Sequence, residues 1–162
     1  TTSIDAVIYC HNLPDGIVKR ESVILFTPQF DGLGLTNDSV RIDDGNTKDK
    51  RPEGTGNAVL VNVRQGENLT VFGEIGWRGR TAEVVSRQAA KRALVFKESG
   101  VPIERHLADQ LLVPLALAGG GSFVTEKLTP HTRTCLELLP LFTDIRSSVT
   151  REDGKAVRIT LQ

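Results

Sequence analysis

Residues 106–123 of this 162-residue chain read HLADQLLVPLALAGGGSF. After its first residues the stretch is almost wholly apolar, and a helix that is hydrophobic on nearly all sides is expected to be buried. Pro114 falls within it and should kink the helix or mark a point of tight docking. The three glycines at 119–121 should end the helix, because glycine is a poor helix former. The stretch therefore predicts a buried core helix over residues 107–118.

Two polar side chains, Asp109 and Gln110, interrupt this apolar helix. A buried carboxylate or amide must be paired or must face a cavity, because an unpaired polar group in a dry interior is costly. The two residues are therefore candidates for ligand contact, or they brace a neighbouring loop. His106 directly precedes the helix, where it can stack on a flat ligand or lie on the surface.

His131 lies further along, in residues 128–134, LTPHTRT, and is one of only three histidines. Imidazole can act as a nucleophile or carry a proton near neutral pH. A surface histidine without a catalytic role is the alternative. The chain has no HExxH motif, no paired Cys and His cluster and no G-x-S-x-G elbow, which excludes zinc hydrolases and serine hydrolases and predicts no metal ligands.

Hydrophobic periodicity predicts the remaining elements. Further strands are expected at residues 3–12, 40–42, 57–63, 69–75, 122–127, 143–149 and 156–161, and further helices at 17–26, after Gly79 and at 132–141. A polar, glycine-rich stretch at 43–56 is predicted to be a mobile loop, and residues 152–154 to turn the last hairpin. This order predicts an α+β fold with layers of helices on mixed or antiparallel sheets.

The helix after Gly79 is amphipathic. Its predicted buried stripe comprises Ala82, Val85, Ala89, Ala93 and Phe96, and its predicted solvent face carries Arg80, Arg87 and Lys91. The basic face can meet RNA phosphates or can simply be solvated.

Bulk composition points to a folded, soluble protein. Charged residues make up 25% of the chain and hydrophobic ones 39%, and the formal net charge is zero, so no field of the whole molecule attracts nucleic acid or membrane. No apolar run approaches the length of a membrane span, and no signal sequence is visible, which predicts a cytoplasmic location. Cys10 and Cys135 have no CxxC spacing and are predicted to be reduced and buried.

Taken together, residues 106–123 and the segment TPHTRT at 129–134 resemble the C-terminal signature of the RNA 3′-terminal phosphate cyclase family. The resemblance lies in an Asp-Gln pair opening an apolar helix, a glycine turn, a strand and a histidine, all in order. The segments GTGN at 54–57 and GRTAEVV at 79–85 also resemble family segments.

The resemblance implies a mechanism. His131 would attack the α-phosphate of ATP, release pyrophosphate and carry AMP as a phosphoramidate. AMP would then pass to an RNA 3′-phosphate, and the neighbouring 2′-hydroxyl would displace it to close a 2′,3′-cyclic phosphate. Asp109 and Gln110 match nucleotide-contacting positions, and His106 matches a position that is often aromatic and stacks on adenine.

The same resemblance covers only part of the family's length. Members are roughly twice as long, and the absent N-terminal half carries the carboxylate for Mg²⁺. Residues 1–99 would form a smaller inserted domain and residues 100–162 the end of the last repeat of the catalytic domain, in a fold shared with enolpyruvate transferases. The chain would then be the C-terminal half of a ligase, inactive without its N-terminal half. The alternative is a non-catalytic relative that binds partners in RNA processing or ribosome assembly.

Overall fold

The computed structural model describes residues 2–14, 16–44, 53–152 and 154–162. The chain divides into two compact units, Thr1–Lys97 and Glu98–Gln162. We describe each unit by itself. The predicted α+β class is confirmed, because each unit packs helices on a sheet of its own.

A four-stranded mixed sheet forms the base of unit 1. Its strands are β1 (Thr2–His11), β2 (Val40–Asp43), β3 (Gly56–Gln65) and β4 (Asn68–Ile75), in the order β2-β1-β3-β4. β1 pairs with β2 in parallel and with β3 in antiparallel fashion, and β3 and β4 form an antiparallel hairpin. The hairpin turn is tighter than the sequence predicts, because Gly66 adopts a φ of 61° and lets both strands run further.

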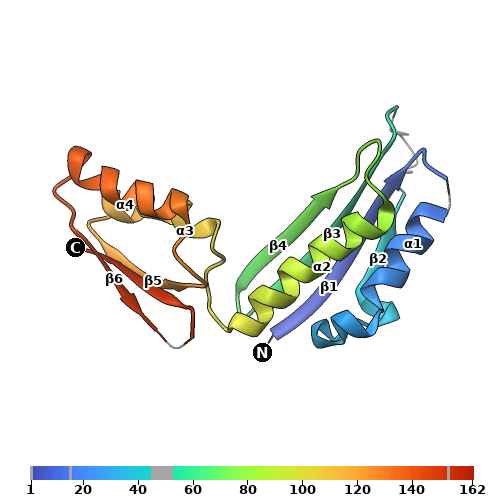
Figure 1. Cartoon of the computed structure of the whole chain (residues 1–162), viewed down its shortest axis with the longest axis horizontal. Helices are drawn as coiled ribbons and strands as arrows, with labels where there is room; N and C mark the ends of the chain where they lie inside the picture. Colours follow the sequence, from blue (N-terminus) through green and yellow to red (C-terminus); the bar gives the residue numbers. More distant parts are fainter. Residues whose placement is uncertain (1, 15, 45–52, 153) are drawn as a thin grey trace. The chain divides into compact units, whose positions relative to one another are not determined.

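Two helices, α1 (Gly16–Leu25) and α2 (Ala82–Ser99), cover one face of this sheet (Figure 1). Short 3₁₀ turns, η1 (Pro28–Leu33) and η2 (Asn37–Ser39), lead from α1 to β2. All five residues of the predicted stripe of α2 are buried, and Phe96 packs on Phe72 of β4 with ring centroids 5.5 Å apart. The covered face is therefore a closed hydrophobic core.

Arg80 departs from the predicted basic face of α2. It precedes the helix, and its side chain is only 7% exposed because it forms a 2.6 Å ion pair with Glu74. Its guanidinium also lies over the ring of Trp77, 4.3 Å from the centroid. Arg87 and Lys91 do lie on the exposed face of α2.

Unit 2 is a three-stranded antiparallel sheet with two helices on one side (Figure 1). Its elements are α3 (Leu107–Leu117), β5 (Gly121–Thr125), α4 (Pro130–Phe142), β6 (Ser147–Arg151) and β7 (Val157–Leu161), with the strands in the order β5-β7-β6. The core joins both helices to β5 and β7 through Ala108, Leu112, Ala116, Phe123, Leu136, Leu139, Ile159 and Leu161. No residue of β6 belongs to this core, so the edge strand is left uncovered.

The prediction that residues 107–118 are buried on nearly all sides is wrong for the described unit. Only one face of α3 packs against the core, and Leu117 is 79% exposed. The helix ends where predicted, at glycines with positive φ, and Gly120 lies so close to the backbone of Leu161 that a Cβ could not be placed there. Pro114 is accommodated inside α3.

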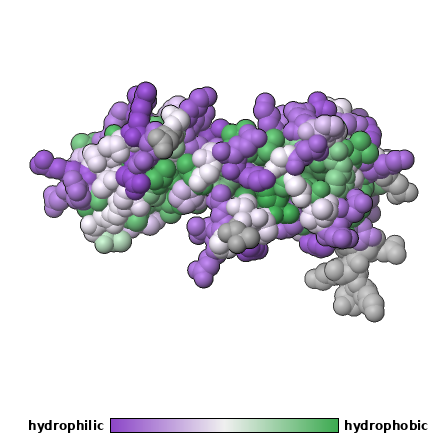
Figure 2. Space-filling view, turned by 90° about the horizontal axis from the view of Figure 1, so that it is seen from below, coloured by the Kyte–Doolittle hydropathy of each residue, from purple (hydrophilic) through white to green (hydrophobic). Residues whose placement is uncertain are grey.

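Several smaller expectations can be checked. Most of the loop predicted at residues 43–56 lies outside the described residues, as does position 153 of the predicted last turn. Cys10 is buried as predicted, whereas Cys135 is only half-buried. Figure 2 shows one face of the surface, on which hydrophobic areas alternate with hydrophilic side chains. Within the described residues, no helix is both long and apolar enough to cross a membrane.

Candidate functional site

His131 is the second residue of α4, which begins two residues earlier than the sequence predicts and so includes His131. The helix begins because Thr129 adopts an extended conformation and its Oγ1 accepts a hydrogen bond from the Thr132 N–H at 3.1 Å, a typical N-cap. Pro130 follows at the first helical position, where its missing N–H costs nothing. The Thr129 and Thr132 hydroxyls are buried and lie 2.8 Å apart. The exposed His131 therefore projects from a fixed helical turn.

A pocket of about 340 Å³ brings the two candidate histidines of unit 2 together. It is lined by Arg105, His106, Lys127, Leu128, Thr129, Pro130 and His131. His131 comes from the start of α4 and His106 from the N-cap position of α3. Residues that are 25 apart in the sequence therefore share one site.

Hydrogen bonds fix the loop that carries His106. The buried Glu104 accepts a hydrogen bond from the His106 N–H at 2.7 Å, and its carbonyl accepts from the first N–H groups of α3. Arg105 donates from Nε to His106 Nε2 at 3.2 Å, and its own N–H donates to Glu126 at 3.1 Å. A parallel bridge between Ile103 and Thr125 holds the same loop beside β5.

Asp109 and Gln110 lie outside this pocket. Gln110 is exposed, and its Nε2 donates to the His106 carbonyl at 3.3 Å, within one turn of α3. Asp109 is half-buried. Neither residue is a dry polar group in a core, so the reason for which the sequence singled them out does not hold within unit 2. Gln110 nevertheless follows His106 on the same side of the helix.

Two cations of the pocket, Arg105 and Lys127, were missed by the sequence analysis. Each is adjacent to a segment that it did single out, since Arg105 precedes His106 and Lys127 precedes residues 128–134. Reading the flanking charges would have found them. Glu104 and Glu126, which position Arg105 and His106, were equally visible as the acidic neighbours of those cations.

The described residues do not form a metal site. Throughout the described ranges, no three His, Cys, Asp or Glu side chains lie close enough together to hold a metal ion.

The arrangement suits chemistry on an anionic phosphorus compound. Among the described residues nothing accepts or donates a hydrogen bond at the His131 side chain, so its ring nitrogens are open to a reactant. Arg105 and Lys127 line the same pocket and can neutralise phosphate oxygens. The His131 N–H also points from a helix N-terminus, where backbone donors favour negative charge.

Sequence comparison gives one consistent family. Residues 34–149 match the family described as RNA 3′-terminal phosphate cyclase. A protein of that name from Koribacter versatilis (strain Ellin345) is 36% identical over 152 residues, which cover 94% of this chain and 41% of the relative. Another, from Ectopseudomonas mendocina (strain ymp), is 37% identical over 109 residues, which cover 67% and 32%. The chain thus spans less than half the length of the curated relatives that it matches.

Proposed function

The chain belongs to the RNA 3′-terminal phosphate cyclase family, and we propose that it supplies the AMP-carrying histidine of an enzyme that converts an RNA 3′-phosphate into a 2′,3′-cyclic phosphate. The observation that carries the proposal is the placement of His131. It projects from a capped helical turn into the same pocket as His106, Arg105 and Lys127.

The proposed reaction has three steps. A ring nitrogen of His131 attacks the α-phosphorus of ATP, a phosphorus–nitrogen bond forms, and the bond to the β-phosphate oxygen breaks to release pyrophosphate. An oxygen of the RNA 3′-phosphate then displaces the imidazole and takes up AMP. Finally the adjacent 2′-hydroxyl attacks the RNA phosphorus and AMP leaves, which closes the ring.

The pocket residues take distinct roles in this scheme. Arg105 and Lys127 balance the charge of the phosphates, and the imidazole of His106 stacks on the adenine. Gln110 follows His106 by one turn of α3, and in the proposed scheme Asp109 and Gln110 contact the part of the nucleotide that extends past His106. Mg²⁺ would neutralise charge on the triphosphate, and we expect its ligands in the part of the family's length that this chain does not span.

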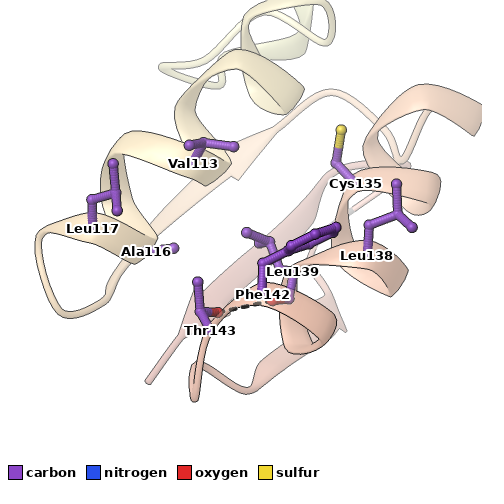
Figure 3. Close-up of a pocket in the computed structure, with 8 residues that line it drawn as sticks. All are labelled: Val113, Ala116, Leu117, Cys135, Leu138, Leu139, Phe142 and Thr143. Carbon is purple, nitrogen blue, oxygen red and sulfur yellow. Dashed lines mark hydrogen bonds between the residues drawn. The ribbon is translucent and has the colours of Figure 1, made fainter.

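The outer face of α3 and α4 supports the proposal that this chain acts together with further protein. The two helices lie side by side and leave an apolar hollow of about 420 Å³ between them (Figure 3). It is lined by Val113, Ala116, Leu117, Cys135, Leu138, Leu139, Phe142 and Thr143, which we call the apolar helix face. Phe142 is 82% exposed. An exposed apolar patch of this kind marks an interaction surface.

We assign this face to the part of the family's length that the chain does not span, whether that part lies on the same polypeptide or on another. In the same scheme residues 1–99 are the inserted domain and residues 100–162 the end of the catalytic domain. ATP and an RNA 3′-phosphate end are the substrates, and the cytoplasm remains the predicted location.

A chimera tests the proposal. In the K. versatilis relative, the matched region is replaced by this chain, and the purified protein is incubated with ATP and Mg²⁺ before its intact mass is measured. We expect a gain of one AMP, which His131→Ala abolishes and which His11→Ala, a substitution of a histidine in unit 1, leaves in place. A folded chimera that gains no AMP, beside a parent relative that does, would contradict the proposal and favour the non-catalytic binding protein.

A further inference from the structure

A second hollow, of about 460 Å³, adjoins the His131 pocket. It is lined by Lys127, Leu128, Arg133, Val149, Arg151, Gly154, Lys155 and Val157, which we call the cationic groove. We propose that this groove binds the sugar–phosphate backbone of the single-stranded RNA that leads to the reacting 3′ end. The inference rests on the proposed function for the identity of the ligand and on the following observations for its place.

The groove exists because the helices of unit 2 stop short of the edge strand. Along β6, Val149 pairs with the buried Ile159 of β7, and Arg151 pairs with the buried Val157. Paired residues share a face of the sheet, so Val149 and Arg151 lie on the helix-bearing face. Yet every residue of β6 is exposed. The uncovered strip between β6 and the start of α4, which presents Arg133, forms the floor and wall of the groove.

The four cations of the groove are available for a ligand. Lys127, Arg133, Arg151 and Lys155 are all exposed, and among the residues that the structure describes none of them forms an ion pair. Two described acids lie next to these cations in the chain: Glu152 is paired with Arg158 at 2.6 Å, and Glu126 accepts a hydrogen bond from the Arg105 N–H at 3.1 Å. Arg158 alternates with the buried Val157 along β7 and so lies on the opposite face of the sheet. The groove therefore concentrates positive charge although the whole chain is neutral.

The groove leads directly to the proposed nucleophile. Lys127 and Leu128 line both the cationic groove and the pocket of His131. A strand whose terminal phosphate reaches His131 must place its preceding phosphates beside that pocket, and the groove supplies cations there. Leu128, Val149 and Val157 give it an apolar floor, as suits sugars and bases between phosphate contacts. A positively charged groove that follows the backbone is the electrostatic part of sequence-independent single-strand binding.

The test measures RNA binding without ATP. A fluorescent single-stranded oligoribonucleotide is titrated with the full 162-residue chain at several salt concentrations, and the double variant Arg133→Gln/Arg151→Gln is compared with wild type. We expect about tenfold weaker binding and a logarithmic salt slope reduced by about 0.7 for each cation removed. Arg146→Gln is the matched control, since Arg146 precedes β6 at the opposite end of the hairpin from Arg151 and lies outside the groove.

Each outcome has a separate meaning. Equal binding by wild type and the double variant, or an equal loss in Arg146→Gln, overturns the groove as the RNA site. Unchanged RNA binding with loss of AMP uptake by the chimera assigns the groove to the triphosphate of ATP and also overturns the inference. If the double variant weakens RNA binding while His131 takes up no AMP, the groove stands and the proposed reaction fails.

Discussion

The two units differ in where they leave large apolar side chains exposed to solvent. In unit 1, α1 and α2 close over one sheet face, and Phe96 of α2 and Phe72 of β4 are buried against each other between helix and sheet. In unit 2, α3 and α4 close over β5 and β7 on their inner side, yet their outer side exposes large apolar residues such as Leu117 and Phe142. The open sheet face of unit 1 mixes polar pairs with exposed apolar residues: Asn62 donates to Asp5 at 2.7 Å, and its strand neighbour Val71 is exposed.

In unit 2 the exposed apolar residues of α3 and α4 gather around one hollow, and we propose that further protein covers it. An antiparallel or mixed sheet can leave one face in water, whereas exposed apolar side chains that gather on two neighbouring helices favour an interaction surface. The histidine pocket and the cationic groove both lie in the incompletely covered unit. The predictions below test whether the two units respond differently to matched changes.

The largest expected difference in the free energy of unfolding is between alanine variants of Phe96 and Phe142. Phe96→Ala should destabilise unit 1 by about 3–5 kcal/mol, because it empties a fully buried site. Phe142→Ala should change the stability of the isolated chain by less than about 0.5 kcal/mol, because the ring is already in water. Urea unfolding followed by fluorescence of Trp77, the single tryptophan, reports unit 1, and circular dichroism follows the whole chain. Similar losses for both variants would contradict the contrast.

A buried carboxyl should give unit 1 its own pH dependence. Glu21 is fully buried, accepts a hydrogen bond from Asn57, and has an Oε2 without a partner among the described atoms. Burial raises the pKa of Glu21 from 4.5 to about 7, although the Asn57 hydrogen bond opposes the rise. Between these values the unfolded carboxyl ionises while the folded one stays protonated, so stability present below pH 4.5 is lost as the pH rises toward 7.

The free energy of unfolding is expected to fall by about 3 kcal/mol between pH 4.5 and about 7 because of Glu21. Glu21→Gln should abolish it and leave unit 1 more stable than wild type at pH 7.5. Glu67→Gln, in the exposed hairpin turn, is the matched control. Tryptophan fluorescence during urea unfolding at pH 4, 5.5 and 7.5 measures the effect. A wild-type profile that rises from pH 4 to 7.5 would show that the sign is wrong.

A smaller effect should be confined to unit 2. Thr129→Ala removes the N-cap of α4 and should cost about 1 kcal/mol, whereas Thr129→Ser should retain most of the stability. Amide exchange of Thr132 is the direct readout, because its N–H donates to the Thr129 hydroxyl. We expect faster exchange in the alanine variant and no change in α2. Unchanged amide exchange at Thr132 would show that the Thr129 cap does not hold the helical turn that carries His131.

The smallest effect on stability should accompany a large effect on association. Leu117→Ser/Phe142→Ser should leave unfolding of the chain within about 0.5 kcal/mol of wild type, because both side chains are exposed. It should nevertheless reduce binding of a hydrophobic dye and any self-association in sedimentation. Val95→Ser, which changes an exposed apolar residue of α2, serves as the control in unit 1. If dye binding falls only in the control variant, the apolar surface that binds the dye lies in unit 1, which contradicts the prediction.

Much of the fold could be predicted from the sequence, because alternation and helical periodicity are local signals. The stripe of α2 from Ala82 to Phe96 is an example. The burial of α3 was wrong because a nearly uniform apolar helix carries no information about how many of its faces are covered by the same chain. The deep pairing of Arg80 with Glu74 was missed because it depends on the path of β4 relative to the turn before α2.

Some residues of the candidate site could be predicted from the local sequence, and others could not. His131 and His106 could be singled out by residue type, and their shared pocket follows from the contact of α3 with α4. Arg133 and Arg151 lie in the same groove only because β6 is an edge strand left bare by the helices, which is a property of the sheet order rather than of any local pattern.

The most direct test of the central claim is AMP uptake as a function of added protein. The part of the K. versatilis relative outside the match is titrated into this full chain with ATP and Mg²⁺, and bound AMP is measured by intact mass. We predict a saturable rise toward one AMP per chain, displaced to higher concentration by Phe142→Asp and absent in His131→Ala. AMP uptake that does not depend on the added part, or that Phe142→Asp leaves unchanged, would contradict the claim that covering the apolar helix face completes the site of His131.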